Sequence, residues 1–222
     1  MSSDNTTTPP PSAEMPRPEQ WLARGEFLRI ACVVQGGLLV VTVGLAWLAG
    51  INLLAQLHFT TTAVLWGVSA TLPMLLLFAV THRFPVGPFR DVKDFLSDTL
   101  GPTLTRCNWL DLAFLSLLAG VSEEMFFRGV VQTWLTATCG VVMALLVSNL
   151  LFGLAHSVSV FYVVLAGLLG LYLAMVFTIT GEANLVPPIL CHALYDFIAL
   201  SVYRLEAIRG QQDGVNTSNV QG

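Results

Sequence analysis

Charged residues are scarce in this sequence. Only 11% of the 222 residues are Asp, Glu, Lys or Arg, and 55% are hydrophobic, whereas about a quarter of the residues of soluble domains are charged. No lysine-rich or arginine-rich run occurs, so the electrostatic footprint of nucleic-acid binding is missing and no nucleic-acid partner is expected. The composition instead predicts a polytopic membrane protein that has the lipid bilayer as its surroundings.

Paired cysteines are absent as well. The four cysteines, Cys32, Cys107, Cys139 and Cys191, show no CxxC spacing, which argues against a zinc knuckle or a redox motif. Each is expected to pack as a small apolar residue. Cys191 precedes His192, but neighbouring residues on a helix point about 100° apart, so a Cys/His nucleophile pair is the less favoured interpretation.

Long apolar segments are what the sequence does contain. A bilayer-spanning helix takes roughly 20 mostly apolar residues, and six segments qualify: residues 27–50, 61–80, 110–135, 140–157, 160–179 and 185–203. Between the second and third of them, apolar residues recur near helical spacing, which predicts an interfacial helix. The predicted fold class is therefore all-α, a polytopic membrane helical bundle of about six transmembrane helices plus this interfacial helix.

The basic residues predict how the bundle is oriented. Nine of the ten lie before or at the start of the first span, between the second and third, or after the sixth: Arg17, Arg24, Arg29, Arg83, Arg90, Lys93, Arg106, Arg204 and Arg209. With six spans these segments share one side, so the positive-inside rule places both termini in the cytoplasm. The tenth basic residue, Arg128, lies inside a span.

The chain divides into four parts. Residues 1–20 are polar and proline-rich, which predicts a disordered tail. Residues 21–108 hold the first two spans and a cytoplasmic connecting segment. Residues 109–203 contain the other four spans, and residues 204–222 form a polar C-terminal tail.

Ionisable residues inside the later spans cost about 2.5–3.5 kcal/mol each on an insertion scale, and six of them are candidates for a functional site. They are Glu123, Glu124, Arg128, His156, His192 and Asp196. Glu124 and Arg128 are four residues apart, so they share a helix face and can pair, whereas Glu123 points about 100° away. His192 and Asp196 also share a face, and a carboxylate beside an imidazole fixes its tautomer.

Taken singly, a buried ion pair or a histidine at a span end is more often structural than functional. Six such groups on three spans predict a common site, provided that the three helix faces converge. That site would activate water and stabilise an oxyanion. At 1.5 Å per residue, Glu123 and Asp196 fall near mid-membrane but His156 near the cytoplasmic end. Either the fourth span extends beyond residue 159 or the site slopes toward the cytoplasm.

Three motifs follow one another in this region. "EEMFFR" fits EExxxR, "FGLAH" fits FxxxH and "HALYD" fits HxxxN/D. In this order and in a membrane context they resemble the CPBP family, also called Abi, which includes the type II CAAX prenyl endopeptidases and bacteriocin-processing or self-immunity proteins. The resemblance covers residues 109–203, which it marks as a CPBP/CAAX-protease-like catalytic core.

The resemblance implies an intramembrane endopeptidase that hydrolyses a peptide or membrane-protein substrate, prenylated in the CAAX branch, without a cofactor. Glu123 would act as the general base, with Glu124 and Arg128 holding it in place. His156 would position water or substrate, and His192 with its partner would stabilise the oxyanion.

Asp196 occupies the place where the eukaryotic branch has asparagine. An ionised aspartate cannot donate a hydrogen bond. Either Asp196 is protonated, which burial favours, or it only orients His192.

Two alternatives stay open at this point. Glutamates and histidines can bind zinc, which takes three protein ligands and a water in a catalytic site, but HExxH is absent and the resemblance favours a mechanism without metal. The second alternative is a non-proteolytic membrane protein, a proton-coupled transporter or a self-immunity or partner protein, that uses the same residues as a proton path. The sequence lacks the internal repeat that many transporters show.

Overall fold

The computed structural model describes residues 22–220, and the side chains of residues 22–213. Within this part of the chain the regular structure is entirely helical. The elements are α1 (Arg24–Leu48), η2 (Leu54–Gln56), α2 (Thr61–Arg83), α3 (Pro88–Thr105), α4 (Trp109–Glu124), η3 (Met125–Gln132), α5 (Thr133–Cys139), α6 (Val141–Ala155), α7 (Val160–Val176) and α8 (Val186–Val220). The predicted all-α bundle is therefore confirmed. The tail predicted for residues 1–20 lies outside the described residues.

Side-chain caps and a glycine turn set several helix boundaries. The Thr60 hydroxyl accepts from the Ala63 N–H at the start of α2, and the Ser159 hydroxyl accepts from the Tyr162 N–H at the start of α7. Each contact satisfies one of the free N–H groups of a first turn. Gly140, with φ of 82°, turns the chain between α5 and α6, in a conformation that glycine adopts without steric cost.

The segment that carries the two adjacent glutamates forms one long rod. α4, η3 and α5 follow each other without a break, and a capping box between Asn108 and Asp111 begins the rod. η3 is a π-helix, a rare form that is frequent at functional sites. The Thr133 hydroxyl donates to the Arg128 carbonyl oxygen at 2.9 Å and so satisfies an acceptor of this wide turn. The rod was predicted from apolarity, but its π-helical part was not.

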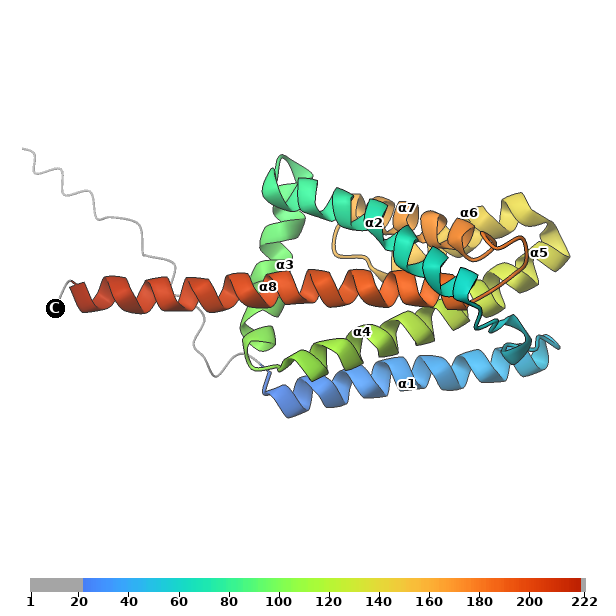
Figure 1. Ribbon diagram of the computed structural model, residues 1–222, viewed down its shortest axis with the longest axis horizontal. Coiled ribbons are helices and arrows are strands. Elements are labelled where there is room, and N and C mark those ends of the chain that lie inside the picture. Colours follow the sequence, from blue (N-terminus) through green and yellow to red (C-terminus); the bar gives the residue numbers. More distant parts are fainter. Residues whose placement is uncertain (1–21, 221–222) are drawn as a thin grey trace, which may run out of the picture.

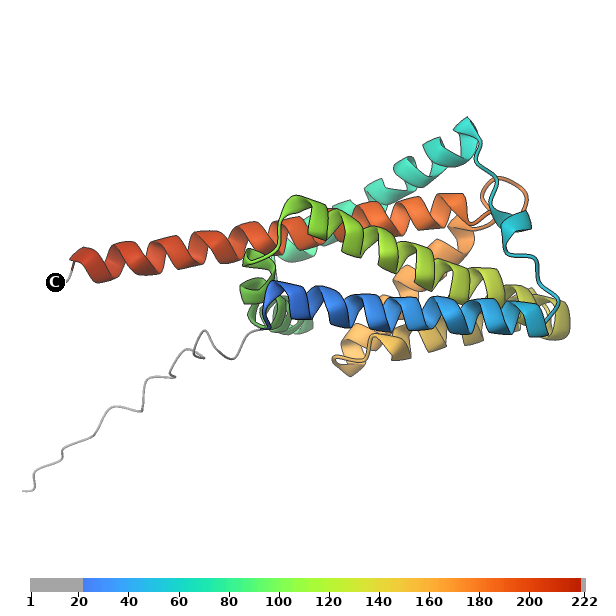
Figure 2. The same cartoon turned by 90° about the horizontal axis from the view of Figure 1, so that it is seen from below.

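α8 runs through the middle of the bundle and packs against α2, α3 and α4 (Figures 1 and 2). Glycine permits the close approach of α4, since a Cβ on Gly120 would lie 3.0 Å from the Ile189 carbonyl oxygen. This contact places the end of α4 beside the first half of α8. α8 also continues to Val220, so the segment predicted as a polar tail begins as part of this helix.

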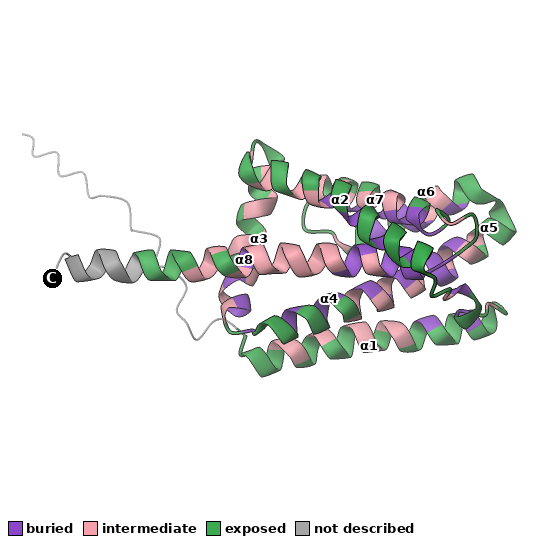
Figure 3. Cartoon of the chain, in the orientation of Figure 1, coloured by how far each residue is buried: buried purple, intermediate pink, exposed green. Residues whose placement is uncertain are grey.

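Many of the exposed side chains of the bundle are large and apolar, whereas part of its interior is charged. Figure 3 shows where the buried and exposed residues lie along the helices. On α1, Val40 and Trp47 are 75% and 80% exposed, while Glu124 and Arg128 are fully buried. Among the described residues, three helices are long and apolar enough to cross a membrane: Arg24–Leu48, Thr61–Arg83 and Val186–Asp213. Two apolar helices, Val141–Ala155 and Val160–Val176, are shorter. The chain is a membrane protein, and the count of six spans stays a prediction.

The polar segments gather at one end of the bundle. Figures 1 and 2 place the start of α1, the whole of α3 and the outer half of α8 together there. α3 corresponds to the interfacial helix that the sequence predicts between the second and third spans.

Candidate active site

Glu124 and Arg128 pair as their spacing predicts. Arg128 Nη1 donates to Glu124 Oε1 at 3.1 Å, and both side chains are fully buried. Arg128 Nη2 donates to the Gly170 carbonyl oxygen at 2.6 Å, and the guanidinium carbon lies 4.6 Å from the centroid of the Phe152 ring. Because a buried charge needs a partner and further hydrogen bonds, Arg128 ties η3 firmly to α6 and α7.

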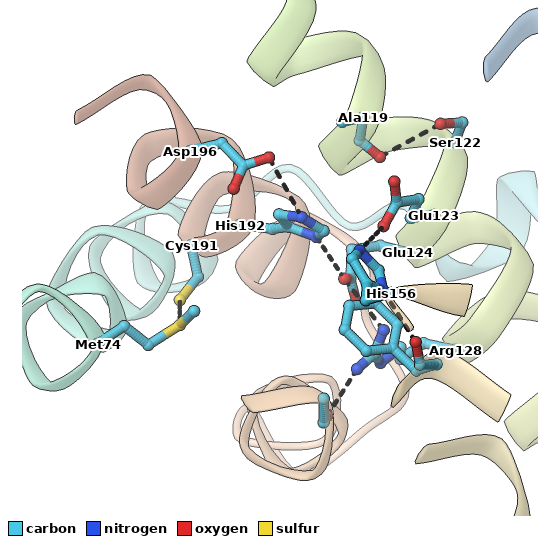
Figure 4. A network of polar contacts seen from close by, with 12 residues as sticks. Met74, Ala119, Ser122, Glu123, Glu124, Arg128, His156, Cys191, His192 and Asp196 are labelled. Carbon is cyan, nitrogen blue, oxygen red and sulfur yellow. Dashed lines mark hydrogen bonds and ion pairs between the residues drawn. The ribbon is translucent and has the colours of Figure 1, made fainter. Parts of the chain in front are cut away.

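Glu124 also joins this pair to α8. Its Oε1 accepts from His192 Nδ1 at 2.8 Å. Since an ionised carboxylate only accepts, Nδ1 carries a proton and Nε2 is the nitrogen left for other partners. His192 Nε2 lies 3.5 Å from Asp196 Oδ2. Figure 4 shows Asp196, His192, Glu124 and Arg128 following one another across the site.

Glu123 has partners on other helices. Its Oε1 accepts from the Gln35 side chain of α1, with 2.9 Å between Gln35 Nε2 and the carboxylate oxygen. Its Oε2 lies 3.6 Å from His156 Nε2 and, within the part of the chain that the structure describes, makes no hydrogen bond although it is buried. Glu123 therefore stays outside the Glu124–Arg128 pair, as the rotation between adjacent residues predicts.

His156 is held by α6, whose C-cap it forms. Its Nδ1 lies 2.8 Å from the Phe152 carbonyl oxygen, which can only accept. In the neutral ring Nε2 is therefore unprotonated and faces Glu123 (Figure 4). The Phe152 ring lies against the imidazole, with 4.6 Å between the centroids and 32° between the planes. α6 ends at Ala155, so the fourth apolar helix does not extend beyond residue 159 and the site lies at the level where α6 ends.

A cavity of about 280 Å³ borders four of the six predicted residues, namely Glu123, His156, His192 and Asp196. Glu124 and Arg128 do not line it, which agrees with their burial behind the other groups. The rest of the lining is mostly apolar and comes largely from α2, α3, α7 and α8. Two carboxylates and two imidazoles of the predicted set thus border a space with mostly apolar walls, and electrostatic interactions are stronger where such walls lower the local dielectric.

Gln35 is the contact that the sequence-based prediction missed. An amide inside the apolar run "ACVVQGGLLVV" is a signal for a buried polar partner. The search for charged residues inside the spans did not select Gln35, however, because glutamine is neutral. Gln35 also precedes the three motifs, the first of which begins at Glu123.

The cysteines take no part in the site. The Cys191 Sγ lies 3.5 Å from the Met74 Sδ on α2, on the opposite side of α8 from Glu124 (Figure 4). Burial raises the pKa of the Cys107 thiol, between α3 and α4, so that thiol is a poor nucleophile. His82, on α2, also borders the cavity, but its partner is Glu206 on α8, at 2.8 Å.

No group of three or more His, Cys, Asp and Glu side chains within residues 22–213 is arranged to hold a metal ion. Glu124 and His192 are bonded to each other, and Glu124 is also bonded to Arg128. A cation here would have to displace or face the buried guanidinium.

Comparison with known families agrees with the motifs. Residues 105–198 match the family described as Type II CAAX prenyl endopeptidase Rce1-like. The resemblance carried by EExxxR, FxxxH and HxxxD is thereby confirmed, and the matched segment is an Rce1-like domain. The match covers less than half of the chain, and over this segment the protein is similar to the CAAX-type intramembrane proteases, which are hydrolases. No match was found among curated proteins or among solved structures.

Proposed function

We propose that this protein is an intramembrane endopeptidase in which Glu123 activates the attacking water. One observation carries the proposal: Glu123 Oε2 is buried, has no hydrogen-bond partner among the described residues and lies 3.6 Å from His156 Nε2 at the edge of the cavity. The separation is too long for a good direct hydrogen bond. A water beside both atoms can bond to each of them.

The two acceptors orient that water. One of its hydrogens points to Glu123 Oε2 and the other to His156 Nε2, so its lone pairs face the cavity. Glu123 takes a proton while the water oxygen forms a bond to the carbonyl carbon of the substrate. When the tetrahedral intermediate breaks its C–N bond, the same proton passes from Glu123 to the leaving amine. Glu123 is thus base and then acid, and it ends each turnover as a carboxylate.

His192 is the group that we assign to the carbonyl oxygen. Glu124 holds Nδ1 at 2.8 Å, and the side chain borders the cavity. When both ring nitrogens carry protons, Nε2–H donates to the developing oxyanion. Asp196 Oδ2, 3.5 Å from Nε2, then orients the ring and balances its charge. Of the two roles open to Asp196, we therefore propose orientation of His192.

The apolar walls favour a lipid-modified or membrane-embedded substrate. Phe78, Leu96 and Leu169, from α2, α3 and α7, are among the side chains around the cavity. We propose a prenylated CAAX-type peptide, in keeping with the family that the domain matches. We also propose that the end of the bundle with α3 faces the cytoplasm, because most basic residues lie in the segments gathered there.

Cleavage by purified protein in liposomes tests this proposal. The probe is a farnesylated, internally quenched peptide that ends in a CAAX sequence, with the unprenylated peptide as a second probe. Glu123→Gln is expected to lower turnover by at least about a hundredfold, the scale of general acid–base catalysis. Glu182→Gln, which removes an exposed loop carboxylate, is expected to keep full turnover.

A metal-chelator arm separates the two enzyme mechanisms. We expect wild-type turnover to survive exhaustive chelation, and a loss that zinc restores would favour the metalloprotease instead. Equal turnover of wild type and Glu123→Gln would contradict the proposed role of Glu123.

A further inference from the structure

We infer that Gln35, on α1, is a positioning residue for Glu123. This inference rests on the proposed function of Glu123 and adds a helix outside the matched segment, since residues 105–198 do not include α1. Gln35 Nε2 donates to Glu123 Oε1 at 2.9 Å, and Gln35 Oε1 accepts from the Ser122 hydroxyl at 2.5 Å. The amide therefore bonds to two successive residues of α4 from across the helix interface.

The orientation of the amide follows from these partners. An ionised carboxylate accepts but does not donate, so the NH₂ group must face Glu123 and the carbonyl oxygen must face Ser122. With Oε1 held by Gln35, Glu123 presents its other oxygen, Oε2, to His156 and the cavity. Gln35 thereby selects which carboxylate oxygen is available to act as the base.

A second contact keeps α1 in register for this role. Arg24 binds Asp111 through two hydrogen bonds of 2.6 Å each, at the starts of α1 and α4. Both Arg24–Asp111 and Gln35–Ser122 join residues 87 positions apart, so the two helices run parallel in a constant register for about three turns. Thr42 and Ala46 on the same helix are buried as well, which extends the face of α1 that is packed. A helix fixed in this way holds a side chain more precisely than a mobile loop does.

Gln35→Met tests the inference, because methionine keeps the length of the side chain but has no amide. The matched control is Gln56→Met, which also removes one amide hydrogen bond between helices, here the buried bond from Gln56 Nε2 to the Gly129 carbonyl oxygen, without touching Glu123. With the farnesylated probe in liposomes, Gln35→Met is expected to lower kcat about tenfold to a hundredfold, the scale of a misplaced catalytic group. KM is expected to stay within about twofold of the wild-type value, because Gln35 does not line the cavity.

Infrared spectroscopy supplies a readout that needs no substrate. The carboxylate stretching band that disappears in Glu123→Gln reports on the environment of Glu123. It is expected to be displaced in Gln35→Met and unchanged in Gln56→Met, since only the first substitution removes a hydrogen bond to this carboxylate. Ser122→Ala, which leaves the amide without its second partner, is expected to give a smaller displacement and a smaller loss of kcat.

The outcomes separate this inference from the proposed function. A Gln35→Met protein with the kcat and the Glu123 band of the wild type would overturn the inference, even if Glu123→Gln is inactive. Should Gln35→Met fail to fold while Gln56→Met folds, the kcat and band of Ser122→Ala decide in the same way. If Glu123→Gln retains full turnover, the proposed function fails, whereas the displaced band would still establish the Gln35–Glu123 contact.

Discussion

Replacing Glu124 by glutamine removes the charge that compensates a fully buried arginine. Arg128 has no exposed surface, and besides Glu124 its guanidinium contacts neutral groups, chiefly the Gly170 carbonyl oxygen and the Phe152 ring. Removal of one partner from a buried ion pair costs about 3–5 kcal/mol, because the other charge stays in a low dielectric. We expect Glu124→Gln to lower the free energy of unfolding by about that amount. The weakened bond to His192 is part of the same network and does not add independently.

A double-mutant cycle isolates the pair. Arg128→Met keeps the apolar stem but leaves Glu124 without its cation, so it is also expected to cost about 3–5 kcal/mol. The double variant removes both charges, and its loss should fall short of the sum of the single losses by about 1–3 kcal/mol, the coupling typical of residues in one network. His192 keeps a neutral acceptor in that variant, so part of the network survives.

Reversible unfolding in detergent micelles, followed by tryptophan fluorescence, measures these free energies. Glu182→Gln serves as the control, because it removes a carboxylate that is exposed and expected to change the stability by less than about 0.5 kcal/mol. Additive losses in the cycle, or a loss below about 1 kcal/mol for Glu124→Gln, would refute the claim that Glu124 compensates Arg128.

Two further predictions concern α8 and the orientation of the bundle. Asp196→Asn should keep kcat within about tenfold of the wild-type value, whereas Asp196→Ala should lose more, because a hydrogen-bond acceptor is enough to orient His192. Equal losses of kcat for the two variants in the liposome assay would contradict this role. The orientation can be tested in a cysteine-free background with a membrane-impermeant thiol reagent added outside cells. Arg90→Cys, on α3, should resist the reagent, whereas His58→Cys, between α1 and α2, should react with it. The reverse labelling pattern would invert the proposed orientation.

Much of the site follows from helical spacing within single segments. The pairs Glu124–Arg128 and His192–Asp196 are each four residues apart, and both bring charged atoms within 3.5 Å. Spacing also predicts that Glu123 lies off the face of that pair. These relations need no tertiary information, because an α-helix fixes them locally, and Glu124–Arg128 persists even though η3 is π-helical.

Contacts between helices are harder to predict from the sequence. Glu124 bonds to His192 across 68 positions and Gln35 bonds to Glu123 across 88, and neither distance is set by the geometry of one helix. The family motifs place residues of α4, α6 and α8 in one site, but they contain no position on α1. Gln35 is also neutral, so the energetic argument from buried charge does not select it.

The extent of α8 and the π-helical form of η3 also differ from what the apolar pattern predicts. The apolar sequence ends near residue 203, whereas α8 continues to Val220. The prediction located spans by their apolar residues, so it did not include this polar continuation of the helix. η3 is not visible in the apolar pattern, since a π-helix and an α-helix can share the same composition.

In the proposed mechanism Glu123 is the general base, and the Glu124–Arg128 pair holds the site together. The decisive measurement is cleavage of the farnesylated CAAX peptide in liposomes by wild type and Glu123→Gln, with the unfolding free energy of both proteins measured in parallel. We expect Glu123→Gln to lose at least about a hundredfold in kcat, while its free energy of unfolding changes by less than that of Glu124→Gln. A Glu123→Gln protein that cleaves the peptide at the wild-type rate would contradict it.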